Sequence, residues 1–540
     1  MTGRTSDDVS MKAPTEESAM PSSDKEKVAR DSARTVAAID VGSNSLRMVI
    51  AEVLAEGSVH GLETLQRAVR LGQDTFRRGR LGGETLRAAM AILRDYKHLL
   101  DLYRVERVRA VATSAIREAR NADTFLDRAY MTTGLNFEVI DTSEESRLTV
   151  SAVRQAVAGA IEVGRQKTLI VDVGGGSTLL TLLENGEIAT AQSLRLGSVR
   201  MLEMLTSSED PPERTAELLR HHIANVIGAA RGSLPLKTVE ALVAVGGDAR
   251  FTAREIGKST ASANLWAVSR KEFDKLVERC DRRSEEELSR EYGLPYAEAE
   301  TLTPALLVYQ KIFHLTRAKQ MIVSCASMRD GLVLELARQV TGEEDTAIIE
   351  GVIHSTMAIA EKYRVDPDHA QQVSDLSVRL FDEMQADHRL LPRYRLLIRL
   401  AGLLHEVGGF VSSRSHHKHS YYLIANSEIF GLNRIETEIV AHVARYHRRS
   451  GPKPSHIEYM SLPRELRVVV SKLSAILRVA DGVARGQIRN MADLHFRRMD
   501  DELLILVPGV TDLILEQRAL RLKGDMFDDV FGTRIRLEEA

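Results

Sequence analysis

The sequence has little cysteine, no long apolar run and almost no net charge. Its 540 residues include two cysteines, Cys280 and Cys325, whose wide spacing fits no metal motif and favours a reducing, cytoplasmic compartment. No run of 18 apolar residues occurs, so we expect no integral membrane segment, and peripheral membrane association stays open. The net charge of −3 excludes a global attraction for polyanions, so phosphate binding would need local groups. No nucleic-acid motif is visible.

The first 34 residues also lack large apolar side chains almost completely. They are rich in Ser, Asp, Glu and Lys, and they have no apolar core of the kind that a signal peptide needs. We therefore predict that residues 1–34 form a disordered tail. The remaining length allows three or four domains.

A glycine-rich stretch, Leu169–Thr178, is the most informative local feature. An apolar strand leads to Asp172, and three glycines follow, so the backbone can approach a ligand closely and adopt positive φ. Successive N–H groups in such a turn bind anions, and Asp172 could hold a metal ion beside a phosphate. The alternative is a strand turn that binds nothing. The candidate phosphate-binding residues are Gly174, Gly175, Gly176, Ser177 and Thr178.

A second copy of this pattern lies 132 positions earlier, at Ala37–Ser45. It again has an apolar strand, an aspartate (Asp40) and a turn of small residues. Two such units predict two related half-domains that face each other across a phosphate chain. The arrangement resembles the actin/hexokinase (ribonuclease H-like) superfamily, at the level of fold only. The phosphate-binding candidates of this turn are Gly42, Ser43, Asn44 and Ser45.

Two further motifs lie at strand–helix junctions between these turns. Thr113–Ala119 contains Glu118 one turn inside a predicted helix, and Asp141–Arg147 contains Glu145 in the first turn of another. Simple helix capping, with first-turn carboxylates that suit the helix dipole, would also explain both motifs.

Together the four motifs, IDVGSNSLRMVIAEV, ATSAIREA, DTSEESRL and IVDVGGGST, resemble the exopolyphosphatase/guanosine pentaphosphate phosphohydrolase (Ppx/GppA) family. The resemblance implies that Glu118 and Glu145 are the catalytic pair, and that Mg²⁺, with K⁺ as a further activator, assists water attack. Arg117 and Arg147 could bind phosphate or pair with these glutamates. The implied metal ligands are Asp40, Asp172, Glu145 and Glu138, and Arg117 is included among the phosphate-binding candidates.

The end of the second half-domain offers fewer signals. The strand at Glu240–Asp248 ends in two glycines, and we interpret these as packing a helix against the sheet rather than touching a nucleoside. Arg329 follows the last predicted strand and could contact phosphate. Ala297–Glu300 departs from the Arg-Ala-Asp that members of the family usually carry.

Beyond about Val340 the pattern becomes helical and resembles an HD-type phosphohydrolase domain. His405 is followed by Glu406 rather than by Asp, which favours a vestigial, structural site over metal binding. The candidate ligands are His369, His405, Glu406, His419, His442 and Asp481. We predict a tail (1–34), two α/β actin-like half-domains (35–155 and 156–338), an all-α HD-like domain (339–488) and a small α/β domain (489–540).

Two basic clusters in the helical part predict a channel for the distal part of a phosphate chain, although charged loops are often only solvated surface. They comprise Arg414, Lys418, Arg445, Arg448 and Arg449.

The sequence thus indicates an exopolyphosphatase that releases orthophosphate from linear polyphosphate, and by analogy a homodimer. Guanosine pentaphosphate is the alternative substrate, because the two activities share these motifs. A phosphate-binding regulator without activity and an ATP-dependent kinase of the same fold are less favoured alternatives.

Overall fold

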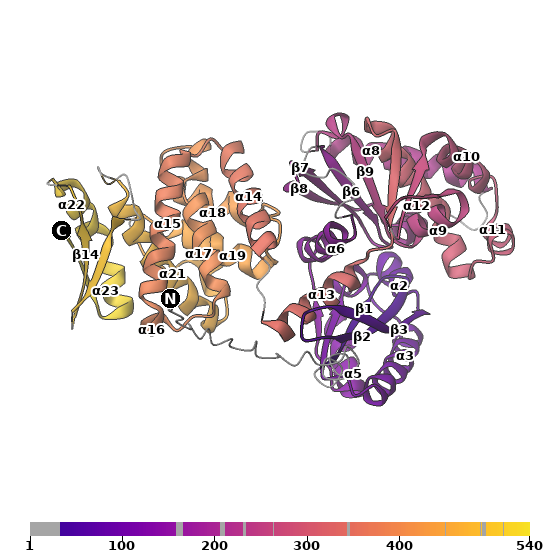
Figure 1. The fold of residues 1–540 in the computed structure, drawn as a ribbon, viewed down its shortest axis with the longest axis horizontal. Helices are drawn as coiled ribbons and strands as arrows, with labels where there is room; N and C mark the ends of the chain where they lie inside the picture. Colours follow the sequence, from indigo (N-terminus) through magenta and orange to yellow (C-terminus); the bar gives the residue numbers. More distant parts are fainter. Residues whose placement is uncertain are drawn as a thin grey trace, which may run out of the picture.

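The computed structural model describes most of the chain in two α/β lobes, a helical region and a terminal sheet (Figure 1). Residues 1–32 of the predicted tail lie outside the described part. In the described residues, no helix is long and apolar enough to cross a membrane. The described residues are 33–157, 166–205, 211–230, 234–262, 264–342, 346–448, 450–485, 488, 493–499, 501–510 and 512–540.

The first lobe contains a five-stranded sheet with the order β3-β2-β1-β4-β5. Its strands are β1 (Arg34–Val41), β2 (Ser45–Val53), β3 (Val59–Ala68), β4 (Arg107–Ala112) and β5 (Phe137–Val139). β1, β2 and β3 pair antiparallel, whereas β4 and β5 run parallel to β1. The helices are α2 (Leu71–Arg78), α3 (Gly83–Leu102), α4 (Ser114–Arg117) and α5 (Ala122–Thr133). The next helix, α6 (Thr142–Val157), buries its apolar side chains mainly against strands of the second lobe.

The second lobe repeats this topology inside a seven-stranded sheet of order β10-β11-β12-β9-β6-β7-β8. β8-β7-β6-β9-β12 matches β3-β2-β1-β4-β5 in order and direction. The strands are β6 (Thr168–Val173), β7 (Thr178–Glu184), β8 (Glu187–Leu194), β9 (Ala241–Val245), β10 (Lys258–Ser259), β11 (Leu265–Ser269) and β12 (Gln320–Ser324). The internal repeat predicted from the two aspartate turns is therefore present in the structure.

Helices complete the second lobe. They are α7 (Ser198–Leu205), α8 (Pro212–Ala230), η1 (Leu236–Thr238), α9 (Gly247–Ile256), α10 (Arg270–Cys280), α11 (Glu285–Tyr292) and α12 (Tyr296–Leu315). The next helix, α13 (Met328–Thr341), follows β12 in the chain but packs elsewhere. The β7–β8 hairpin turns at Asn185 and Gly186, whose φ angles of 53° and 84° suit a type I′ turn.

The central strands are buried on both faces, which explains their continuous apolar sequences. Side chains alternate across a strand, so in β1 Ala37 and Ile39 join one core and Val36 and Ala38 join another. The second of these cores contains Leu332 and its neighbours from α13.

α13 thus belongs with the first sheet, where Figure 1 places it beside β1 and β2. The predicted boundary at residue 338 assigned this helix to the second half-domain. That assignment differs from the structure, because the apolar face of α13 is buried against the strands with which the chain began.

The helical region follows, and its last helix packs against the two helices of the terminal unit, which in turn pack on the three-stranded sheet. One apolar cluster joins Leu473 of α21 with Phe527 and Leu537, so the terminal unit shares its core with the helices. The elements are α14 (Thr346–Lys362), α15 (Pro367–Glu383), α16 (Gln385–His388), α17 (Arg393–Leu404), η2 (Val407–Phe410), α18 (His416–Ala425), α19 (Arg434–Arg445), α20 (Ile457–Met460), α21 (Arg464–Val483), β13 (His495–Arg498), β14 (Glu502–Val507), α22 (Ile514–Lys523), α23 (Asp525–Phe531) and β15 (Arg534–Glu539).

Candidate active site between the two lobes

The two aspartate turns have the same backbone geometry. In the first turn the N–H of Gly42 donates to the carbonyl of Ser45 at 3.1 Å, and in the second the N–H of Gly174 donates to the carbonyl of Ser177 at 2.9 Å. Within the described residues, the N–H groups of Ser43 and Asn44 in the first turn donate to no acceptor in the protein. The same is true of the N–H groups of Gly175 and Gly176 in the second turn. Paired turns with free N–H groups are suited to bind anionic oxygens from two sides.

A cavity of about 510 Å³ lies between these turns. Both lobes contribute to its wall, α6 adds Glu145, and α13 adds Met328 and Arg329 from its N-terminal end. The polar and glycine residues of the wall include Asp40, Gly42, Ser43, Asn44, Ser45, Arg47, Glu145, Asp172, Gly174, Gly175, Gly176, Ser177, Gly246, Gly247, Asp248, Arg250 and Arg329.

The glycines of the second turn are needed for space rather than for positive φ, which none of the three adopts. A Cβ atom on Gly176 would lie 2.1 Å from the Oγ atom of Ser114, in the first lobe. A Cβ atom on Gly197 would lie 2.2 Å from the carbonyl carbon of Gly176. The absence of side chains therefore lets the two lobes touch at the cavity.

Three carboxylates in the wall fit a hard divalent cation. The Oδ1 atom of Asp40 is buried without a hydrogen-bond partner among the described residues, and Oδ2 lies 3.4 Å from Nη1 of Arg47. Burial raises the pKa of Glu145 to about 7, and the nearby charges of Asp40 and Asp172 add to the rise. Burial also raises the pKa of Asp172. A buried carboxylate without a partner is energetically unfavourable, and a bound cation would offset this cost. Carboxylate oxygens are also the ligands that Mg²⁺ prefers.

Glu145 is oriented by Arg117 and by the start of its own helix. Nη1 of Arg117 donates to Oε1 of Glu145 at 2.6 Å and to the carbonyl of Ile140 at 2.5 Å. Arg117 therefore pairs with the glutamate, one of the two roles considered for it. The other arginine, Arg147, likewise pairs with a carboxylate, that of Glu144.

Asp141 caps α6. Its Oδ1 atom accepts from the N–H of Glu144 at 2.9 Å, and its Oδ2 atom accepts from the N–H of Arg434 in α19 at 2.7 Å. One carboxylate thus joins the helix of Glu145 to the helical region.

Glu118 lies beside the cavity but is not part of its wall. Its carboxylate accepts a 2.5 Å hydrogen bond from Nη2 of Arg200, and Arg195 lies at 3.3 Å. The Nε atom of Arg200 donates to the carbonyl of Gly176 at 2.6 Å, and its guanidinium lies over Phe76. Arg200, in the first turn of α7, was not predicted as a site residue.

Three predicted ligands have other contacts in the structure. Glu138 is outside the cavity and pairs with Arg109 at 3.3 Å. Thr178 is fully buried, and its hydroxyl donates to the carbonyl of Leu196. The amide of Asn44 donates to the carbonyl of Ala297 at 2.8 Å, which ties the first turn to α12.

Conversely, Arg47, Asp248 and Arg250 line the cavity and were not predicted as site residues. The Gly246–Gly247 turn places Asp248 and Arg250 in the cavity wall. The prediction that these two glycines only pack a helix against the sheet therefore did not place this turn at the cavity. Burial raises the pKa of Asp248 to about 7.

The basic residues of the helical region gather near His417. Burial, with the charges of His416, Arg448, Lys418 and Arg445, lowers the pKa of His417 to about 4. Arg445 also pairs with Glu458 at 3.2 Å. Arg414 and Lys418 are exposed, and Arg449 lies outside the described residues.

Of the predicted HD-like ligands, His369, His405 and Asp481 lie together, with donor atoms within 4.8 Å of one another. Glu406 is not in this group and lies 4.0 Å from Arg485. His419 is not in the group, and His442 is buried among Tyr421, Tyr446 and Tyr459.

Comparisons with known proteins agree with this architecture. The sequence profile of the Ppx/GppA phosphatase family matches residues 49–340, and the profile of Ppx/GppA phosphatase, domain III, matches residues 353–522. The chain is 28% identical over 460 residues to a guanosine-5'-triphosphate,3'-diphosphate pyrophosphatase of Aliivibrio fischeri, covering 82% of this chain and 86% of that relative. A protein of the same name from Photobacterium profundum is 25% identical over 451 residues, covering 82% and 84%.

The structure is also similar to that of an exopolyphosphatase from Cytophaga hutchinsonii. The TM-score is 0.52 at 22% identity, and the match covers 58% of this chain and 99% of the other, a likeness that shows the shared fold. Because the first profile spans more than half of the chain, from β2 in the first lobe to α13, the protein belongs to the Ppx/GppA phosphatase family.

Proposed function

We propose that the protein removes the terminal phosphoryl group from a linear chain of phosphates, with inorganic polyphosphate as the main substrate. The paired turns are the observation that carries this proposal, because they offer N–H donors to one phosphate chain from both lobes. Hydrolysis of such a chain requires mainly that the phosphoryl group be held, its charge neutralised and a water molecule aligned.

Three arginines in the cavity wall supply positive charge for the substrate. The Nε atoms of Arg47 and Arg329 are buried without an acceptor in the described part of the chain, so both retain donors for phosphate oxygens. Arg250 lies in the same wall. Charge-assisted hydrogen bonds of this kind hold phosphate more tightly than neutral ones do.

Asp40, Asp172 and Glu145 are the residues that would hold Mg²⁺, and K⁺ stays a predicted activator. When bound, the cation would neutralise charge on the phosphate oxygens and acidify a water molecule. The unpartnered Oδ1 atom of Asp40 supports this assignment.

Glu145 is the proposed general base. A carboxylate with a pKa of about 7 can accept a proton from water near neutral pH, and Arg117 holds one of its oxygens in place. Glu118, the second member of the proposed pair, is oriented by Arg200 at the contact between the lobes. We propose that it helps to orient the attacking water when the substrate fills the cavity.

Guanosine pentaphosphate is the second candidate substrate. Two observations favour it: the relatives that match 82% of this chain carry the pyrophosphatase name, and the cavity wall includes the apolar side chains of Phe251, Leu294 and Leu302. A nucleobase needs such a surface, whereas a bare phosphate chain does not.

The deciding experiment is orthophosphate release in Mg²⁺ from long polyphosphate and from guanosine pentaphosphate, at equal concentrations of terminal phosphate. We expect a higher kcat/KM on polyphosphate. A preference for the nucleotide would support the second candidate, and no release from either would refute the proposed hydrolase.

A further inference from the structure

Three histidines of the helical region share one unusual arrangement. The Nδ1 atom of His405 lies 2.7 Å from the carbonyl oxygen of Gly402, and the Nδ1 atom of His447 lies 2.5 Å from that of Ala444. His416 has the same contact with the residue three positions before it, at 3.3 Å. An Nδ1–H that donates to a carbonyl leaves the lone pair on Nε2, which is the tautomer that binds metal ions.

The free nitrogen of His405 has no partner inside the protein. His405 is fully buried, and within the described residues its Nε2 atom makes no hydrogen bond. Leaving a buried polar atom unsatisfied costs about 1–3 kcal/mol, and at His405 the unsatisfied nitrogen lies close to two further side chains that can ligate a metal ion.

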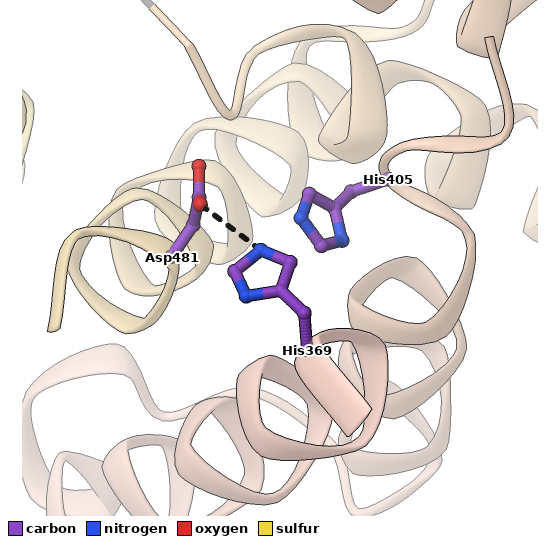
Figure 2. Close-up of side chains that lie close together, drawn as sticks. All are labelled: His369, His405 and Asp481. Atoms are coloured by element: carbon purple, nitrogen blue, oxygen red, sulfur yellow. Dashed lines mark ion pairs between the residues drawn. The ribbon is translucent and has the colours of Figure 1, made fainter. Parts of the chain in front are cut away.

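This nitrogen belongs to a group of three donors from three helices. Figure 2 shows His369, His405 and Asp481 around a common space, and their donor atoms lie within 4.8 Å of one another. His369 is in α15, His405 ends α17, and Asp481 is in α21. A ring nitrogen of His369 is 3.6 Å from the Oδ1 atom of Asp481.

More imidazoles extend the group on one side. The ring of His447 lies 5.0 Å from that of His405, and the ring of His416 lies 5.1 Å from that of His447. The Nε2 atoms of His416 and His447 are 3.1 Å apart. The side chain of His369 is 19% exposed, which gives solvent access to the otherwise buried group.

We propose that His369, His405 and Asp481 bind a divalent transition-metal ion of the zinc class, with His447 beside it. Donor atoms around an ion with bonds of 2.0–2.1 Å are separated by roughly 3 to 4 Å, so small side-chain rotations would close the present group around an ion. Two imidazoles and one carboxylate favour zinc, cobalt or nickel over Mg²⁺, which prefers oxygen. The site lies in the helical region, outside the cavity between the lobes, and does not depend on the proposed hydrolase activity.

The ion would share Asp481 with two cationic side chains. Lys523, the last residue of α22, contacts the Oδ2 atom of Asp481, and the Nε atom of Arg485 lies 3.0 Å from Oδ1. Like charges repel, so Lys523 weakens the binding of the ion while it holds the terminal unit against α21. Removing the ammonium group should therefore tighten metal binding.

The test is titration of the untagged, full-length protein with Co²⁺ in excess Mg²⁺, followed by visible d–d absorption and by calorimetry. We expect one saturable Co²⁺ per chain whose spectrum shows nitrogen ligation, and displacement of Co²⁺ by Zn²⁺. H405Q should weaken this binding by about 10-fold or more, and K523M should strengthen it.

H442Q is the matched control, because His442 is equally buried in the same region but lies outside the group. Circular dichroism would verify that each variant is folded. The proposal is overturned if the wild-type protein takes up no Co²⁺, or if H405Q binds it as tightly as H442Q does. Because Mg²⁺-dependent phosphate release is measured separately, loss of activity alone would not affect the conclusion.

Discussion

Gly176→Ala is the sharpest test of the contact between the lobes. The new Cβ atom would lie 2.1 Å from the Oγ atom of Ser114, about 1.3 Å short of the 3.4 Å at which ordinary contact begins, and 2.9 Å from Phe76. Both neighbours belong to the first lobe, so the lobes must separate or the second turn must shift. Overpacking of this kind costs about 1–3 kcal/mol. A displacement of about 1 Å at a reacting centre can lower the rate about 100-fold.

Gly247→Ala is the matched control. Gly247 also lines the cavity, but a Cβ atom there would meet nothing within 4 Å, and its φ is not positive. We expect G176A to lower kcat/KM for phosphate release about 100-fold. It should also lower the midpoint temperature of the first unfolding transition by several degrees, whereas G247A should leave both quantities nearly unchanged. If G176A retained wild-type activity, or if both variants lost it equally, the inferred contact between the lobes would be wrong.

Three other predictions concern the proposed roles of single side chains. Glu145→Gln should reduce the kcat of phosphate release by about 100-fold or more while polyphosphate binding, followed by fluorescence anisotropy, is retained, and near-normal turnover would exclude it as the base. Because the proposed Mg²⁺ ligand Glu145 has a pKa of about 7, Mg²⁺ must displace its proton, and the affinity for Mg²⁺ in calorimetry should rise about 10-fold between pH 6 and pH 8; a pH-independent affinity would contradict this. Arg448→Ala should raise KM for long polyphosphate more than for short chains, with exposed Arg497→Ala as the control, and an equal effect on both lengths would argue against a channel.

Local sequence patterns were sufficient to predict the repeated half of the fold. An apolar strand, an aspartate and a turn of small residues encode their structure within a few positions, so Asp40 and Asp172 were placed correctly at the ends of β1 and β6. The type I′ hairpin is likewise encoded by two adjacent residues, Asn185 and Gly186. The return of α13 to the first sheet was not predictable, because its partners in β1 lie almost the whole length of both lobes away in sequence.

Single side chains in the sites were harder to predict for the same reason. Arg47 and Arg250 are two of 73 basic residues, and only the pairing of strands and the packing of α9 direct them into the cavity. Among the histidines, His442 lies within α19 and packs among tyrosines, whereas His447 lies just beyond the end of that helix and packs beside His405. The sequence offers no reason to prefer His447, whereas the packing of α19 against α17 and α21 decides it.

Asp141 makes the position of the proposed base depend on a part of the chain remote from it. One of its carboxylate oxygens holds the first turn of α6 and the other holds the first turn of α19. A rotation of the helical region that broke the contact with Arg434 would loosen the cap of the helix that carries Glu145. Docking of the helical region and alignment of the active site are therefore linked energetically, and the linkage is reciprocal: a substrate that fixes α6 should also tighten docking. Binding of a long phosphate chain to the helical region could then tune hydrolysis at the far end of the same chain.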